Sequence, residues 1–175
     1  VQTCALPIFA QPLDVIQKTG VHLGFINFPT AVDQTIRGFG TQFVTQNCPV
    51  KVLHLKTLPS FAIATLDAAK IPFTPPTADQ QLLFYGPHQQ FPHISFWQVL
   101  DSGQWQSVLN NGAVFKDKIV LIGSTDILHQ DFHPTVFFDT QHRAYKMSGV
   151  EFHATAIANL EEHRSLTVLI TNPLL

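Results

Sequence analysis

The stretch from Lys118 to Leu160 decides the fold that the sequence predicts. It opens with KIVLIGSTDILHQDFHPT (residues 118–135), continues through a polar insert, and closes with MSGVEFHATAIANL (residues 147–160). Ile119–Ile122 is an uninterrupted apolar run, which is typical of a strand buried on both faces of a parallel sheet. Gly123–Thr125 then predicts a tight polar loop at the end of that strand.

A helix is predicted over the second half of this stretch. Ser148 and Glu151 have the spacing of a capping box, in which each side chain bonds the backbone amide of the other residue. Apolar residues then recur at helical spacing on one face: Val150, Ala154, Ile157 and Leu160. Strand, polar loop and helix form the unit of α/β folds. Binding groups are therefore expected in loops beyond the carboxyl ends of the strands, where the Asp131–Thr135 segment is placed.

The segments upstream repeat this alternation of strands and helices. Strands are expected over Val21–Phe28 and Gln80–Tyr85, and Phe39–Leu55 is ambiguous but compatible with two strands. Helices are expected over Phe61–Ala69 and over Ser95–Leu100, the latter with a second capping box and an apolar face. Together these segments predict an α/β fold, a single domain in which a mostly parallel (mixed) sheet is flanked by helices.

Composition limits the classes of function. The chain has 175 residues, of which 45% are hydrophobic, so one globular domain with a real core is expected. A formal net charge of -2 without a basic block argues against a nucleic acid or an anionic membrane surface as partner. Most of the 9 histidines are expected to be solvated, and they would gain charge below about pH 6. No run of about 20 apolar residues occurs that could cross a bilayer.

Both ends of the sequence have the character of cut edges. Val1–Ile8 reads VQTCALPI, which looks like a translated sequencing adapter, so the protein proper is expected to begin near Phe9. Cys4 would then be an artefact and Cys48 would have no disulfide partner, whereas two native cysteines can form a bridge in an oxidising compartment. Residues 166–175 turn apolar and are expected to lead into a missing transmembrane helix. Missing N-terminal strands would expose a sheet edge, so poor expression in isolation is expected.

Motifs in four stretches, taken in order, resemble the second type of CHASE domain, the extracellular sensory module of bacterial membrane receptors. The first is Gly24–Asn27 with Asp33 and Arg37; the second is Leu83–Pro87 with Phe91–Pro92 and Ser95–Leu100; the third is Phe115–Gly123 with Asp131, His133 and Thr135; the fourth is Gly149–Ala154 with Ala158–Leu160. No single motif is decisive, but their order over Gly20–Leu160 makes the resemblance specific.

The sequence departs from the family pattern at several positions. Phe84 stands where the family usually has Asn, and the arginine that the family has before Gly86 is absent. The Phe138-Asp139 pair comes late relative to the usual proline after Thr135. The N-terminal portion of the family domain also has no counterpart, so residues 9–165 are expected to form a partial domain.

The resemblance implies an extracytoplasmic domain, periplasmic or extracellular, that senses an unknown small-molecule or protein signal. In the parent receptor it would be followed by membrane helices and then by a cytoplasmic output. Such outputs include an adenylate or guanylate cyclase, a histidine kinase or a serine/threonine kinase. The parent is expected to be a homodimer, with membrane attachment only through helices absent from this chain.

The candidates for a ligand-binding role combine the motif positions with their chemistry: Arg37, Asp131, His133, Thr135, Glu151 and His153. Asp131 and His133 would point the same way on an extended segment, and zinc binds both residue types. Glu151 and His153 would lie about 200° apart around a helix and could not face one ion. A metal site, structural hydrogen bonding in the loop and cap, and a ligand or interface role all stay open for these residues. Arg37 would either clamp a carboxylate or phosphate or hold Asp33.

Neither catalytic residues nor a cofactor or metal is predicted. The sequence has no Gly-rich phosphate loop, nucleophile elbow or His-Glu-x-x-His motif, and Ser124 would need a histidine base beside it. The preferred hypothesis is a sensory domain, in which a signal favours one of two states. The alternatives are a metal-dependent hydrolase that uses Asp131, His133 and His153, and a dimerisation module without a ligand.

Overall fold

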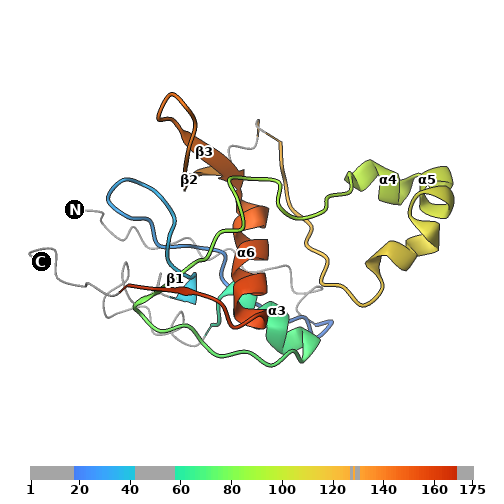
Figure 1. Cartoon of the computed structure of the whole chain (residues 1–175). Coiled ribbons are helices and arrows are strands. Elements are labelled where there is room, and N and C mark those ends of the chain that lie inside the picture. Colours follow the sequence, from blue (N-terminus) through green and yellow to red (C-terminus); the bar gives the residue numbers. More distant parts are fainter. Residues whose placement is uncertain (1–17, 42–57, 127, 129–130, 169–175) are drawn as a thin grey trace, which may run out of the picture.

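The computed structural model of the chain describes residues 18–41, 58–126, 128 and 131–168. The regular elements, in chain order, are α3 (Phe61–Ala69), β1 (Gln80–Gln81), α4 (Phe96–Leu100), α5 (Ser102–Ser107), the 3-10 helix η1 (Asn110–Phe115), β2 (Phe132–Phe138), β3 (Ala144–Ser148), α6 (Gly149–Glu161) and β4 (Leu166–Thr167). The strands make two antiparallel sheets of two strands each, β1–β4 and β2–β3. Helix α6 runs through the centre of the molecule, with α3 beside its C-terminal half (Figure 1).

The predicted parallel sheet was wrong. Ile119–Ile122 has no regular secondary structure, and no described residue pairs with it in a strand ladder. Ile119 and Leu121 still pack against the core, while Val120 and Ile122 are 50% and 81% exposed. An apolar run can therefore be extended and half-buried without becoming a strand, because a strand also needs a hydrogen-bonded neighbour. The fold is a mixed one of a few helices and short antiparallel sheets.

The other predicted strands are also shorter than expected. Within Val21–Phe28 only Phe25 pairs, in an isolated parallel bridge to Ser60. Within Gln80–Tyr85 only the first two residues form a strand, paired with Thr167 and Leu166. Most of Phe39–Leu55 lies outside the described residues.

The helix predictions were confirmed. Helix α3 covers the predicted residues and ends at Lys70, whose left-handed φ of 57° turns the chain before Pro72. Helix α4 begins after Ser95, and the Oε1 atom of Gln98 accepts a hydrogen bond from the Ser95 amide at 3.1 Å. Helix α6 begins after Ser148 and extends over the predicted range.

The core lies on α6, which is buried over most of its circumference. Phe152, Ala156, Ile157 and Leu160 of this helix are buried with residues of α3 and of the segments beside it. The other buried members of the cluster are Ile36, Phe39, Ala62, Leu66, Leu82 and Met147. Of the predicted apolar face, Ile157 and Leu160 are buried, whereas Val150 and Ala154 are only partly buried.

A buried amide side chain fastens the segment after β1 to α6. Asn159 is 1% exposed; its Oδ1 atom accepts from the Leu83 amide at 2.7 Å, and its Nδ2 atom donates to the Leu83 carbonyl at 3.0 Å. Nδ2 also approaches the hydroxyl of Tyr85 at 3.3 Å, and that hydroxyl donates to Glu162 at 2.8 Å. The amide thus supplies Leu83 with the two bonds that a neighbouring strand would otherwise make.

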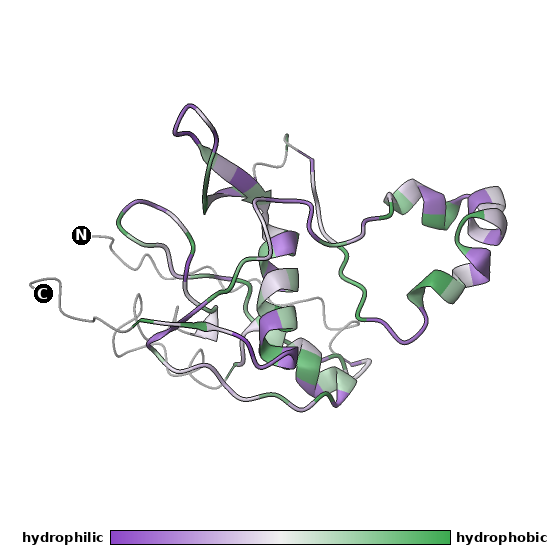
Figure 2. Cartoon of the chain, in the orientation of Figure 1, coloured by the Kyte–Doolittle hydropathy of each residue, from purple (hydrophilic) through white to green (hydrophobic). Residues whose placement is uncertain are grey.

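Helices α4, α5 and η1 form an arm that extends away from α6 (Figure 1). Within the arm α4 packs on α5 and α5 packs on η1, and the rings of Trp105 and Phe115 stack with centroids 6.2 Å apart. Gly112, with φ of 84°, lies under the ring of Trp105, where an added Cβ would clash. Hydrophobic residues occur in the arm as they do in α3 and α6 (Figure 2).

The Asn159 hydrogen bonds lead to a stability prediction. Asn159→Leu keeps the volume but leaves the Leu83 amide and carbonyl without these partners, so the free energy of unfolding should fall by about 2–4 kcal/mol. Urea denaturation followed by circular dichroism measures the change. Gln106→Leu, at an exposed amide of α5, is the control and should change stability by less than about 0.5 kcal/mol. Equal stability of the Asn159 variant and the wild type would contradict the structural role given to this amide.

Candidate functional site

Most of the candidate residues lie where the β2–β3 hairpin meets the N-terminus of α6. Asp131–Thr135 was predicted to be a loop, but it leads into and forms the first part of β2. His133 pairs with Met147, and Phe132 pairs with Ser148, so the hairpin ends at the residue directly before the first residue of the helix, Gly149. The loop prediction was wrong because it depended on a parallel strand at Ile119–Ile122 that does not form.

The polar insert is the turn that closes this hairpin. The Oδ1 atom of Asp139 accepts from the backbone amides of Gln141 at 2.8 Å and Arg143 at 2.9 Å. The Oδ2 atom accepts from Nε of Arg143 at 2.8 Å, and these bonds, that from the Arg143 backbone first, lower the pKa of Asp139. Side-chain bonds from an aspartate to the backbone of the next few residues are a common turn signal. This signal is present in the sequence, but the hairpin turn was not predicted from it.

Asp131 joins the hairpin to the helix. Its carbonyl accepts from the Gly149 amide at 3.0 Å, and its carboxylate lies so close over Gly149 that a Cβ there would overlap the oxygens. The Oδ1 atom is 3.2 Å from Nε2 of His133. Asp131 and His133 therefore do point to the same place, and the carboxylate lies at the helix end that favours negative charge.

The capping box predicted for Ser148 and Glu151 does not form. Ser148 occupies the cap position with an extended backbone, but its side chain makes no cap hydrogen bond. The Oε1 atom of Glu151 instead accepts from the amide of Gln90 at 2.8 Å, a contact with a residue 61 positions earlier. Since Asp131 already bonds the Gly149 amide, the start of the helix is held from outside the helix.

His153 is packed between aromatic rings. Its ring centroid is 4.9 Å from that of Phe28 and 4.9 Å from that of Phe61. Burial lowers the pKa of His153 to about 4, and the nearby charge of Asp131 opposes part of that shift. The imidazole is thus neutral near pH 7, and it is partly buried between the two aromatic rings.

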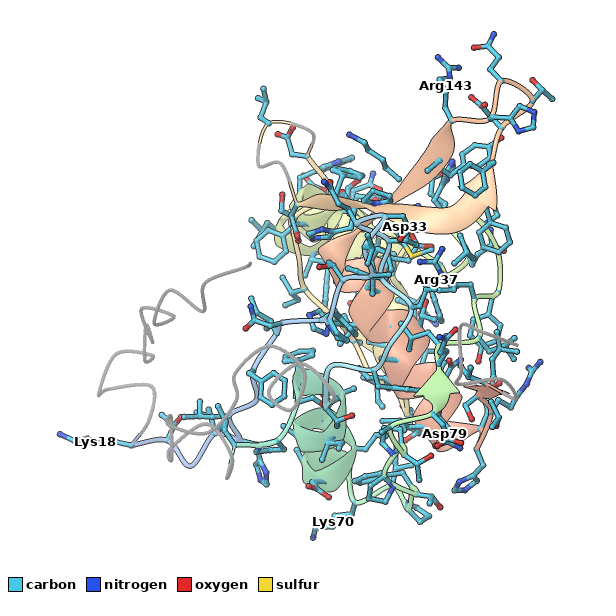
Figure 3. All side chains as sticks on the ribbon, turned by 90° about the vertical axis from the view of Figure 1, so that its left-hand side faces the viewer. Lys18, Asp33, Arg37, Lys70, Asp79 and Arg143 are labelled. Carbon is cyan, nitrogen blue, oxygen red and sulfur yellow. The ribbon has the colours of Figure 1, made fainter. Side chains whose placement is uncertain are left out.

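Thr135 and Arg37 form hydrogen bonds with residues other than Asp131 and His133. Thr135 is fully buried, and its hydroxyl accepts from the Phe137 amide at 3.2 Å. Arg37 binds both carboxylate oxygens of Asp33, at 2.8 and 2.7 Å (Figure 3). This contact holds the pKa of Asp33 well below its usual range. Of the two roles considered for Arg37, the structure shows the bond to Asp33.

The pair formed by Asp131 and His133 can donate and accept hydrogen bonds, but it offers few metal ligands. Across residues 18–41, 58–126, 128 and 131–168, no group of three or more His, Cys, Asp and Glu side chains could hold a metal ion.

Among the same residues, no helix combines the length and apolar character needed to cross a membrane. Sequence reasoning missed Gln90 as the partner of Glu151, because nothing local in the sequence signals that contact.

The partly buried imidazole of His153 predicts a pH dependence of stability. A folded pKa of about 4, against 6.5 in the unfolded chain, means that the unfolded state binds the extra proton between these values. The free energy of unfolding that the neutral imidazole of His153 contributes is fully present above pH 6.5 and is lost as the pH falls toward 4. Between pH 7.5 and 5.0 the wild type should lose about 2 kcal/mol more than His153→Phe, measured by urea denaturation.

His142→Asn is the control for this measurement, since His142 is an exposed turn residue. It should keep the full pH dependence of the wild type. If His153→Phe and the wild type lose stability in parallel, burial of the imidazole is not the cause.

Comparison with models of protein families gives a match over most of the chain. The model of the CHASE2 domain matches residues 7–173, nearly the whole chain. Neither the comparison with curated proteins nor the comparison with solved structures gives a match. CHASE2 domains are extracytoplasmic sensory domains of receptors. The resemblance inferred from the four ordered stretches is thereby confirmed, and the chain belongs to the CHASE2 domain family.

Proposed function

We propose that this chain is the signal-receiving domain of a bacterial transmembrane receptor. The observation that carries the proposal is the family match over residues 7–173. In the proposed receptor the domain faces the periplasm or the exterior and is joined to membrane helices outside this chain. It relays to a cytoplasmic output, such as an adenylate or guanylate cyclase, a histidine kinase or a serine/threonine kinase.

Helix α6 gives this proposal a physical route for a signal. Its N-terminus is held by Asp131 and by the bond from Gln90 to Glu151, and its C-terminal half is held by Asn159. After the helix the chain enters β4, which pairs with β1, and the Val168 amide donates to the Asp79 carbonyl at 3.0 Å. A signal that favours one position of the helix would therefore displace β4, and the only thermodynamic requirement is unequal affinity for two states.

Catalysis is not part of the proposal. The family is a sensory one rather than a catalytic one. A metal-dependent hydrolase would need His153 beside Asp131 and His133 with its ring free to bind an ion. The rings of Phe28 and Phe61 pack against that imidazole instead.

The location of the domain is testable in the parent protein. Alkaline phosphatase fused after Val168 in the full-length receptor should be active, because that enzyme needs the oxidising conditions outside the cytoplasm to form its disulfides. A fusion at the end of the output domain is the control and should be inactive. An inactive phosphatase after Val168, with the fusion protein present in full, would contradict an extracytoplasmic sensor.

The arm favours a second candidate function, the pairing of two copies of the chain. Phe96, Trp97 and Leu100 of α4, named here the arm face, are 58%, 59% and 72% exposed. Large apolar residues grouped on a surface commonly mark an interface. Helix α4 (FWQVL) contains no charged residue, so the arm faces of two identical copies can meet without repulsion of like charges. Two sensory domains paired in this way would form a homodimeric receptor.

Pairing through the arm face predicts a change in oligomeric state. The wild-type chain should dimerise at micromolar concentration, and Trp97→Ser should weaken the dimer at least tenfold, since the indole provides much of the apolar area. Sedimentation velocity over a concentration series measures this. Val32→Ser, at a fully exposed apolar residue outside the arm, is the control and should leave the dimer unchanged. A wild-type chain that stays monomeric at all concentrations would rule out this candidate.

A further inference from the structure

A groove of about 410 Å³ runs along the outer side of α3. Phe61, Ala64 and Ala68 line it from the helix, at a spacing that places them in one stripe. The opposite side is formed by residues 21–22 and 118–119, two segments that are far apart in sequence. The groove exists because the stripe consists mostly of alanines, whose short side chains leave room between the helix and these segments.

The inner surface of the groove is mainly apolar. Ala69, Val21 and Ile119 add apolar side chains to the stripe on α3. The hydroxyl of Thr65 also lines the groove, but it donates to the Phe61 carbonyl at 2.8 Å, so its donor is used within the helix. A ligand in the groove would therefore meet hydrocarbon along most of its length.

The polar groups of the groove are cationic or neutral donors. Lys118 and His22 line it, and none of the described residues that line it carries a carboxylate. Among the described residues no carboxylate forms an ion pair with the Lys118 ammonium. An imidazole can donate a hydrogen bond from whichever nitrogen carries the proton, so both side chains suit an anionic oxygen.

We propose that this groove binds a small amphiphilic carboxylate, with the carboxylate on Lys118 and the apolar part along the alanine stripe of α3. Ligand sites commonly measure roughly 300–1,000 Å³, and this groove lies at the low end, so it suits a ligand of about ten non-hydrogen atoms. Carboxylates with a linear or aromatic hydrocarbon part of that size fit both the charge and the shape. This proposal rests on the sensory function proposed above and names the chemical class of the signal.

The test uses octanoate as the probe and the full 175-residue chain, with binding followed by isothermal titration calorimetry at pH 7.5. Octanoate should bind saturably, and each CH₂ removed from the chain of the probe should weaken binding about threefold to fourfold. Octan-1-ol, which has the same hydrocarbon part without the charge, should bind at least about tenfold more weakly.

Two variants locate the site. Ala68→Leu fills the groove at an exposed helical position and should abolish octanoate binding, and Lys118→Gln should weaken it at least about tenfold. Lys70→Gln, at an exposed lysine that ends α3 but does not line the groove, is the matched control and should bind as the wild type does. Thermal melts establish that each variant is folded.

Two results would overturn the proposal: no saturable binding of octanoate by the folded wild type, or equal binding by the wild type, Ala68→Leu and Lys118→Gln. The proposed sensory function fails separately, through an inactive phosphatase fusion in the parent protein. If the phosphatase fusion is inactive but Ala68→Leu abolishes the binding of octanoate, the groove is still supported as the binding site.

Discussion

The hydrogen bonds between the Asn159 side chain and the Leu83 backbone are the constraint on which the arrangement of the structure depends. Leu83 lies just beyond β1, where the short sheet has ended, and its peptide group must find partners next to an apolar helix. A buried peptide group without partners costs about as much as a lost hydrogen bond. Asn159 supplies both bonds from within the helix. This allows the chain from Leu83 to Tyr85 to follow α6 without a neighbouring strand, whereas the amide of Leu82 still donates to the Arg37 carbonyl at 2.8 Å.

Bonds and packing between α6 and distant segments also explain how the fold is held together although its strands are few and short. At its N-terminus α6 is bonded by Asp131 and by the Glu151–Gln90 contact, and on its flanks it buries Phe152, Ile157 and Leu160. The residues bonded to α6 come from different parts of the chain, so the central helix joins segments that are far apart in sequence.

The sequence allowed the helices to be predicted but not the sheets. The ranges of Phe61–Ala69 and of Gly149–Glu161 follow from local apolar spacing and helix-forming residues, which are visible in a short window, although neither Ser60 nor Ser148 makes a side-chain cap hydrogen bond. Ile119–Ile122 has the composition of a strand, but whether it pairs depends on residues far away in sequence. The hairpin of Phe132–Ser148 was missed although Asp139 and Arg143 signal its turn. The expectation of a parallel strand had already assigned that segment to a loop.

In the candidate site, too, features set by local sequence were predicted and contacts with distant residues were not. The proximity of Asp131 and His133 follows from their spacing of two on an extended chain, and it was predicted. The burial of His153 depends on Phe28 and Phe61, and the contact of Glu151 depends on Gln90, so neither could be inferred from local sequence. Thr135, chosen for its place in a motif, is a buried residue of the hairpin. The groove along α3 likewise requires three segments to be brought together.

Amide hydrogen exchange at Leu83, followed by nuclear magnetic resonance on the uniformly ¹⁵N-labelled chain, tests the central structural claim most directly. If Asn159 holds this peptide group against α6, the Leu83 amide should exchange only through global unfolding, as slowly as the amides in the middle of α6. Exchange of Leu83 at the rate of the exposed loop residues Gln89 and His93, while α6 stays protected, would contradict the account.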